Sequence, residues 1–279
     1  NDSETSAPHQ LTLTATPIPR TLSMSVYANM DVSVIDELPP GRKPIQTSCL
    51  PLSGKDKLIE RMLAATKQGS KVYWICPLIE ESENLDLNAV METYEDLSEH
   101  FSQEKVGCLH GKLSANKKQE QIQSFKDSKT SILVSTTVVE VGVDIPDADI
   151  MVIENAERFG LAQLHQLRGR IGRGTKESFC ILLHKDKIQD VSSQRLQVLV
   201  DSQDGFKIAE EDLVIRGPGE IMGAQQTGIV PMKYTNLVRD SQYLMETKKV
   251  AELICNEEPE LANQLIERWI SGSIAFADA

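Results

Sequence analysis

Short apolar runs alternate with amphipathic stretches from about residue 46 to about residue 186. Five uninterrupted apolar runs stand out, at residues 72–76, 106–109, 132–135, 150–153 and 180–183. Runs of this length without polar interruption are typical of strands that are buried on both faces. Because helical patterns separate the runs, the sequence predicts an α/β fold with one mostly parallel sheet and helices on both of its faces.

Two of the helical patterns carry their own start and stop signals. Apolar residues at helical spacing, including Leu58 and Met62, predict a helix that ends at Gly69. A second helix is predicted to begin after Ser114 as its N-cap and to bury Ile122 and Phe125.

The two ends of the chain do not follow this alternation. Residues 11–17 resemble one more strand followed by a breaker, and Pro39-Pro40-Gly41 marks a turn or linker. We therefore expect residues 1–45 to be the tail of a preceding lobe with a linker, and residues 46–186 to form the main lobe. Residues 187–279 are predicted to be a third, helical region with helices near 191–200 and 237–269, interrupted around Arg216-Gly217-Pro218-Gly219.

Composition describes an ordinary globular chain. The 279 residues are 40% hydrophobic and 25% charged, and no apolar run approaches the roughly 18 residues of a membrane span. The polar start is unlike a signal peptide, and the five cysteines are scattered without a CxxC pair. We therefore predict a cytoplasmic protein with reduced thiols, no membrane partner and no metal site of its own.

The net charge of −12 counts against a nucleic-acid partner. Its distribution weakens that objection, because much of the acid is concentrated between residues 80 and 104, whereas residues 158–187 are basic. The local field decides whether a phosphate backbone is attracted. We interpret the acidic block as a solvated helix face.

Two Gly-Arg pairs repeat in register as Gly169-Arg170 and Gly172-Arg173. Arg170 and Arg173 lie on one side of a helical turn, a placement that suits the spread negative charge of a phosphoryl group in transfer. An isolated Gly-Arg pair would more simply be a surface turn with a salt bridge. The repeat favours contact with a nucleoside triphosphate, and Gln166, one turn earlier, is predicted to orient that site.

A second candidate segment runs from Thr136 to Asp144, directly after a predicted strand. It could be no more than a strand end, a loop and a glycine turn. Beside the arginine pair we favour a functional interpretation. Thr136 would bind a nucleic-acid phosphate, Gly142 would allow close backbone approach, and Asp144 would bind a ribose hydroxyl or a water.

Histidines show no metal-ligand spacing. His110 and Gly111 follow a predicted strand, where we expect them to approach a nucleic-acid backbone, whereas His165 is interpreted as structural.

The phosphate-binding half of an NTP site is not found. Ser53-Gly54-Lys55-Asp56 lacks the upstream glycine of a P-loop and has Asp where magnesium needs Ser or Thr, so we interpret it as a loop and helix start. The acidic pair Asp36-Glu37 is followed by Leu38-Pro39-Pro40 and fits a linker better than a magnesium-binding strand. Alone, this chain is predicted not to hydrolyse ATP.

These segments resemble motifs of superfamily 2 helicases. Thr14-Ala15-Thr16 is similar to motif III, residues 136–144 to motif V and residues 166–173 to motif VI. Longer strings resemble the C-terminal part of the RecG family of bacterial ATP-dependent DNA helicases: TATPIPRTL, DELPPGR, CPLIEESE, ENAERFGLAQLHQLRGRIGRG, DLVIRGPGE and IERW. The Mfd family of transcription-repair coupling translocases shares TATPIPRTL and GLAQLHQLRGR, whereas DELPPGR, CPLIEESE and RGPGE favour RecG.

The resemblance implies a motor with two RecA-like lobes, of which this chain holds the second, that remodels forks and four-way junctions in recombination and repair. ATP with Mg²⁺ would bind between the lobes, the metal held by the other lobe, and Arg170 and Arg173 would reach it as arginine fingers. The resemblance also implies a monomeric motor that acts on branched duplex DNA in the bacterial cytoplasm, close to the nucleoid.

Residues with a coupling role are implied by the resemblance alone: Thr14, Thr16, Arg195, Arg216 and Gln226. The family commonly has Arg before that last glutamine, but this chain has Gln225, which leaves a charge contact there in doubt. Three other interpretations stay open: an Mfd-like translocase, a non-catalytic nucleic-acid-binding module and an RNA helicase.

Overall fold

The computed structural model describes residues 11, 13, 33–35, 37, 43–77, 83–102, 105–136, 148–172, 174, 176–216, 240 and 243–270. Several predicted site residues lie outside this set: Thr14, Thr16, Gly142, Asp144, Arg173 and Gln226. Among the helices that are described, none is long and apolar enough to cross a membrane.

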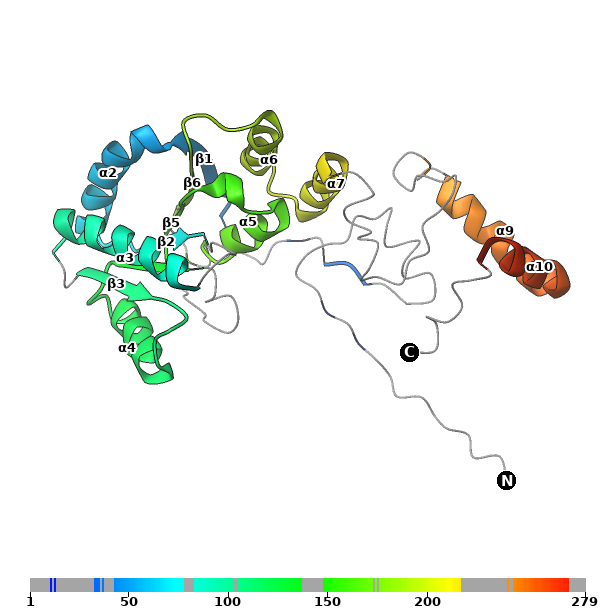
Figure 1. The fold of residues 1–279 in the computed structure, drawn as a ribbon, viewed down its shortest axis with the longest axis horizontal. Coiled ribbons are helices and arrows are strands. Elements are labelled where there is room, and N and C mark those ends of the chain that lie inside the picture. The colour runs from blue at the N-terminus through cyan, green and yellow to red at the C-terminus, as the bar shows by residue number, and fades with distance from the viewer. Residues whose placement is uncertain are drawn as a thin grey trace, which may run out of the picture.

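A parallel sheet of six strands forms the centre of the described chain (Figure 1). Its strands are β1 (Ile45–Pro51), β2 (Val72–Cys76), β3 (Val106–Leu109), β4 (Ile132–Thr136), β5 (Ile150–Ile153) and β6 (Ser178–His184). Their order is β1-β6-β5-β2-β4-β3, and every neighbouring pair is parallel. In the central strand, Trp74 is paired with Val134 of β4 and Val152 of β5.

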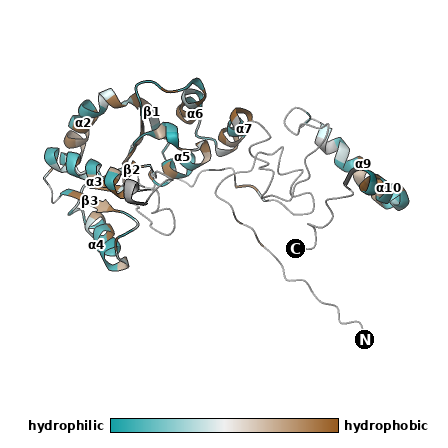
Figure 2. Ribbon diagram, in the orientation of Figure 1, coloured by the Kyte–Doolittle hydropathy of each residue, from teal (hydrophilic) through white to brown (hydrophobic). Residues whose placement is uncertain are grey.

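Helices cover both faces of this sheet. The order along the chain is η1 (Leu52–Gly54), α2 (Lys55–Lys67), α3 (Glu83–His100), α4 (Ala115–Lys126), η4 (Ala156–Arg158), α5 (Leu161–Arg168), α6 (Asp190–Asp201), α7 (Gly205–Arg216), α9 (Leu244–Glu257) and α10 (Pro259–Ile270). Figure 2 shows hydrophilic and hydrophobic bands on the helices around the sheet, as expected of elements with one buried side.

Apolar residues that follow one another in β2, β4, β5 and β6 enter different hydrophobic clusters. In β2, Tyr73 and Ile75 join a cluster that includes side chains of α4, α5, α6 and α7. Trp74 and Cys76 join a second cluster with side chains of α2 and α3. The predicted α/β sheet with helices on both faces is therefore confirmed.

Local signals place the helix ends where the sequence predicted them. The hydroxyl of Ser114 accepts a hydrogen bond from Lys117 N and caps α4, which buries Ile122 and Phe125. Gly69 adopts a φ of +84° just after α2, a left-handed conformation that favours glycine at the end of a helix. The segment around Gly54 is a short 3-10 helix that leads into α2, so its interpretation as a helix start is confirmed.

The five strands predicted between residues 72 and 183 are present, and β1 and α7 were not predicted. The strand predicted at residues 11–17 lies largely outside the described residues. The centre of β1 consists of Gln46, Thr47 and Ser48, which give no apolar run, and its only fully buried residue is Ile45. Apolar residues of α7 are spread around the helix, so Ile208 is buried while Val214 is exposed. The helical prediction for residues 237–269 corresponds to α9 and α10, which pack against each other and are separated at Glu258. The predicted region boundaries at residues 45 and 186 stay predictions.

Candidate nucleotide and DNA site

The predicted site residues that the structure describes lie at both ends of the parallel strands. Parallel strands all end on the same side, and ligands of open α/β sheets bind there. Thr136 is the last residue of β4 and His110 follows β3, so both lie at this edge. Arg170 lies at the opposite end of the strands, in the loop that leads from α5 to the first residue of β6 and contacts the first residue of β1.

The prediction that one helical turn carries both arginines is wrong, because α5 ends at Arg168 and Gly172 has a positive φ. Arg170 lies instead in a loop that is fixed at both ends. At the end of α5, Arg170 N donates to Leu167 O at 2.9 Å, and Ile171 N donates to Arg168 O at 3.3 Å. The side chain of Ile171 is 1% exposed and packs in the core. Gly172 then adopts a φ of +74°, and a Cβ there would lie 3.0 Å from Ile45 Cγ1 of β1. The backbone that carries Arg170 is therefore pinned between α5 and β1.

The electrostatic surroundings of Arg170 include a buried phenol of the sheet. Burial raises the pKa of Tyr73 to about 12, while a hydrogen bond with Ser135 and the positive charge of Arg170 act in the opposite direction. Tyr73 and Ile171 belong to the same hydrophobic cluster, so the Arg170 loop lies on the face of the sheet that carries Tyr73. Gln166 is exposed on α5, one turn before Arg170.

Thr136 has an unsatisfied hydroxyl at the carboxyl end of β4. The side chain is 2% exposed, and within the described residues its Oγ1 is buried without a hydrogen-bond partner. The neighbouring Ser135 Oγ donates to Thr136 O at 2.8 Å, so it satisfies the carbonyl and not the hydroxyl. A buried polar group without a partner is costly, which makes Thr136 Oγ1 a good candidate to bind a ligand.

His110 stands at the rim of a cavity between α3 and α4, next to edge strand β3. Its Nδ1 is buried with no partner among the described residues, and burial together with Lys118 and Lys112 lowers the pKa of the imidazole. Gly111 is exposed, and a Cβ at this position would have no described neighbour within 4 Å.

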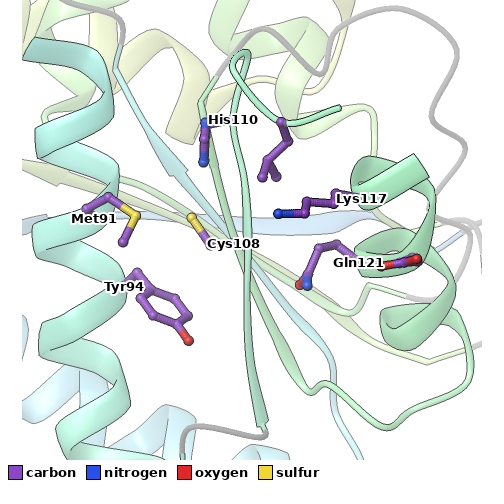
Figure 3. Close-up of a pocket in the computed structure, with 8 residues that line it drawn as sticks. Met91, Tyr94, Cys108, His110, Lys117 and Gln121 are labelled. Carbon is purple, nitrogen blue, oxygen red and sulfur yellow. The ribbon is translucent and has the colours of Figure 1, made fainter. Parts of the chain in front are cut away.

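The cavity has a volume of about 380 Å³. In Figure 3, side chains from both helices and from the β3 edge point into the same space. It is lined by Met91, Tyr94, Cys108, His110, Leu113, Lys117, Glu120 and Gln121. The lysines near His110 make this end of the cavity attractive to an anion such as a backbone phosphate.

Arg195 connects α6 to the segment that precedes α5. Its Nη1 donates to Phe159 O at 3.3 Å. Its Nε is buried without a partner in the described chain, and so are both carboxylate oxygens of Glu157 in η4. Arg216 is the last residue of α7, and its side chain lies outside the described part.

A polar network beside the site could not be recognised from the sequence. Glu154, directly after β5, accepts hydrogen bonds from Trp74 Nε1 at 2.9 Å and Thr93 Oγ1 at 3.2 Å. Lys55 Nζ lies 3.3 Å from Glu154 Oε1 and 2.8 Å from Asp96 Oδ2. Burial lowers the pKa of Lys55, but the two carboxylates outweigh it, so the pKa is raised overall. The network fixes the end of β5 to α2 and α3.

Arg168 is buried although it belongs to the basic segment of the sequence. It is 3% exposed, and burial lowers the pKa of its guanidinium. Nη1 donates to Leu199 O at 2.6 Å and Ser202 O at 2.8 Å, both at the end of α6. Nη2 lies 3.1 Å from His165 Nδ1, which agrees with a structural role for this histidine.

No metal cluster occurs in the part of the chain that the structure describes. Cys76 and Cys180 are buried in the core, as expected of packing residues, while Cys255 on α9 is exposed.

Comparisons with known proteins agree with this arrangement. Residues 54–175 match the family model of the helicase conserved C-terminal domain, and residues 202–268 match domain 3, C-terminal, of the ATP-dependent DNA helicase RecG. A solved structure of RecG bound to a three-way DNA junction superposes with a TM-score of 0.64 at 44% identity, over 82% of this chain and 30% of that chain. The fold and the site thus define a helicase C-terminal lobe.

Comparison with proteins of similar sequence shows which helicase family the chain belongs to. The chain is 50% identical to the ATP-dependent DNA helicase RecG of Pasteurella multocida, over 95% of this chain and 38% of the relative. It is 49% identical to the protein of the same name from Escherichia coli K12, over 98% of this chain and 39% of that protein. The chain belongs to the RecG family of helicases and spans about two fifths of the length of these relatives.

Proposed function

We propose that the chain is the second motor lobe of an ATP-dependent DNA helicase that remodels branched DNA. The observation that carries this proposal is the loop of Arg170, whose backbone is fixed between α5 and β1. The names of the relatives and the three-way junction bound by the similar RecG structure support the substrate class.

In this proposal, ATP binds between this lobe and a second one. Arg170 and Arg173 act as arginine fingers on the transferring phosphoryl group, and Gln166, Gly142 and Asp144 complete this side of the site. Mg²⁺ would neutralise the phosphates when bound, and its ligands would come from the other lobe. Arg170 suits its role because a guanidinium on a fixed backbone loses little freedom on binding.

DNA would be bound through its backbone. The unsatisfied hydroxyl of Thr136 would donate to one phosphate, and His110 with Gly111 would contact another beside the lysines of α4. These contacts are independent of sequence, as expected for a motor that moves along DNA.

Movement would be coupled to ATP through the helices that follow the sheet. Arg195 already links α6 to the start of α5, and Arg216, Gln226, Thr14 and Thr16 are proposed to extend this link. We propose a monomeric motor of the bacterial cytoplasm, acting near the nucleoid, since the relatives named above are bacterial.

The direct test is ATP turnover by the full-length protein with and without a three-way DNA junction. We expect strong stimulation by junction DNA, weak stimulation by RNA of the same shape, and no turnover by the isolated chain. Stimulation by RNA but not by DNA would support an RNA helicase. DNA binding by the full-length protein without any turnover would support a non-catalytic module.

A further inference from the structure

The cavity beside β3 lies at the edge of the sheet. β3 is the last strand in the sheet order, and within the described sheet it is hydrogen-bonded to β4 only. Cys108 packs against the cluster that contains α3, whereas a Cβ at Gly107 would lie 2.8 Å from Gln121 Oε1 of α4. The helices α3 and α4 therefore cover opposite faces of the sheet, and the cavity lies between them, around the edge of β3.

The two walls of the cavity differ in chemistry. Met91 and the ring of Tyr94, both on α3, form an apolar wall. Lys117, Glu120 and Gln121 on α4 form a wall of charged and hydrogen-bonding groups. Figure 3 shows Met91 and Tyr94 on one side of this space, with Lys117 and Gln121 on the other. A flat molecule with an apolar face and a polar edge would fit between such walls.

A nucleobase has this combination of surfaces. Its faces stack on aromatic side chains, and its edge donates and accepts hydrogen bonds. In the cavity, Tyr94 would offer the ring for stacking, while Glu120 and Gln121 would face the edge of the base. The volume of about 380 Å³ lies within the range of small-molecule sites and leaves room for one nucleotide.

The rim of the cavity favours DNA as the source of that base. His110 Nδ1 is buried with no hydrogen-bond partner among the described residues, and Lys112 and Lys118 bring positive charge to it. A backbone phosphate at this rim would bring its base close to the cavity, since only a sugar separates the two. An extended peptide fits less well, because β3 offers an edge of only four residues for strand pairing.

We propose that the cavity between α3 and α4 holds one unpaired base of branched DNA, stacked on Tyr94, next to a backbone phosphate at His110. The proposal rests on the proposed function and adds a base contact to the backbone contacts given there. A base that is already unpaired, as in a single-stranded arm of a fork, enters without the breaking of a base pair. The contact would therefore favour branched DNA over fully paired DNA.

The test uses the full-length protein and a DNA fork with one single-stranded arm. A stable abasic analogue replaces one nucleotide of this arm at a time, and fluorescence anisotropy measures the affinity of wild type, Tyr94→Leu and Tyr94→Phe. Leucine removes the ring but keeps an apolar side chain, whereas phenylalanine keeps the ring. Tyr243→Leu is the matched control, because Tyr243 is 56% exposed at the start of α9 and does not line the cavity.

In wild type, removal of the base at one position of the arm should weaken binding about fivefold or more, as for the loss of one stacked base. Tyr94→Leu should bind the intact fork about as weakly as wild type binds that abasic fork, and base removal should weaken its binding little further. Tyr94→Phe and Tyr243→Leu should behave as wild type does. The salt dependence of the affinity should be the same in Tyr94→Leu and wild type, because the ring contacts no phosphate.

Equal affinity of wild type for the intact fork and for every abasic fork would overturn the proposal. An equal loss on base removal in Tyr94→Leu and wild type would overturn it as well, because the base would then bind elsewhere. If Tyr94→Leu does not fold, photocrosslinking of wild type to 5-iodouracil at the sensitive position decides. A crosslink to α3, β3 or α4 is expected, and a crosslink elsewhere or none would overturn the proposal. Failure of wild type to bind the fork at all would instead overturn the proposed function.

Discussion

Glu154 uses both carboxylate oxygens to join three elements at the end of β5. One oxygen accepts from Trp74 and Thr93, and the other faces Lys55, whose charge is shared with Asp96. Since each partner is at least partly buried, loss of the carboxylate would leave the indole N–H without an acceptor and would remove one of the two carboxylates beside Lys55.

Glu154→Ala is therefore expected to lower the free energy of unfolding by about 3 kcal/mol. Urea unfolding followed by circular dichroism measures this change. The control is Lys129→Ala, which removes an ion pair with Asp127 from a lysine that is 75% exposed. Exposed pairs of this kind contribute less than about 1 kcal/mol. Equal losses in the two variants would contradict the role of the network.

His110 offers a test of the predicted phosphate contact. Burial and two nearby lysines hold the pKa of its imidazole below the ordinary value, so the folded protein favours the neutral ring. A bound phosphate would offset the lysines and raise the pKa, with uptake of a proton. NMR titration of His110 with and without duplex DNA measures this shift. An unchanged pKa in the DNA complex would place the backbone elsewhere.

The sequence predicted the positions of some site residues but not the contacts between residues far apart in the chain. The sequence placed Thr136 and His110 at the carboxyl ends of strands, because each follows an apolar run that is typical of a buried parallel strand. It could not find the partners of Lys55 or Arg168. Glu154 is 99 residues from Lys55, and Thr47 is 121 residues from Arg168, and no local pattern records such a contact.

At the scale of elements, the loop between α5 and β6 decides where Arg170 lies. Gly172 has a positive φ and touches Ile45, whereas a Cβ at Gly174 would meet nothing within 4 Å. The two glycines lie in the same loop, but only Gly172 has a conformation and a close neighbour that disfavour a side chain. Gly174 is therefore a matched control for a substitution at Gly172.

Gly172→Ala is expected to cost about 1–3 kcal/mol of stability, because alanine is strained in the left-handed region and its Cβ would crowd Ile45. The resulting shift of the loop should also lower DNA-stimulated ATP turnover. Gly174→Ala should change neither quantity. Thermal unfolding measures the stability of both variants, and steady-state ATPase assays measure their turnover. Wild-type stability and turnover in Gly172→Ala would contradict the claim that Gly172 fixes the loop.

Elements with strong local signals were predicted well. The five apolar strands and the capped helix α4 follow from runs and caps that lie within the element itself. β1 was missed because its edge position leaves most side chains partly exposed, so Thr47 and Ser48 fit as well as apolar residues. α7 was missed because its apolar residues do not form one stripe, and its place depends on packing against α5 and α6.

For the molecule as a whole, buried acids set the response to high pH. Burial raises the pKa of Cys76 and Cys180 to about 12, well above the ordinary value of a thiol. Above pH 9 the unfolded chain loses these protons while the folded chain keeps them, so the free energy of unfolding falls as pH rises until the folded pKa is reached.

Between about pH 9 and pH 12, each of the two thiols should lower stability by up to about 1.4 kcal/mol per pH unit. Urea unfolding at a series of pH values measures the slope. A variant with Cys76→Ala and Cys180→Ala should show a flatter slope, although it is less stable at pH 7. An equal slope in both proteins would contradict this assignment.

The proposed ATP turnover depends on Arg170 completing an ATP site that another lobe begins. The most direct measurement is kcat for ATP with junction DNA in the full-length protein and its Arg170→Ala variant, with exposed Arg158→Ala as the control. An arginine finger predicts a fall of kcat on the order of 10³-fold or more in Arg170→Ala. Arg158→Ala should retain wild-type turnover. Wild-type kcat in Arg170→Ala would contradict the account.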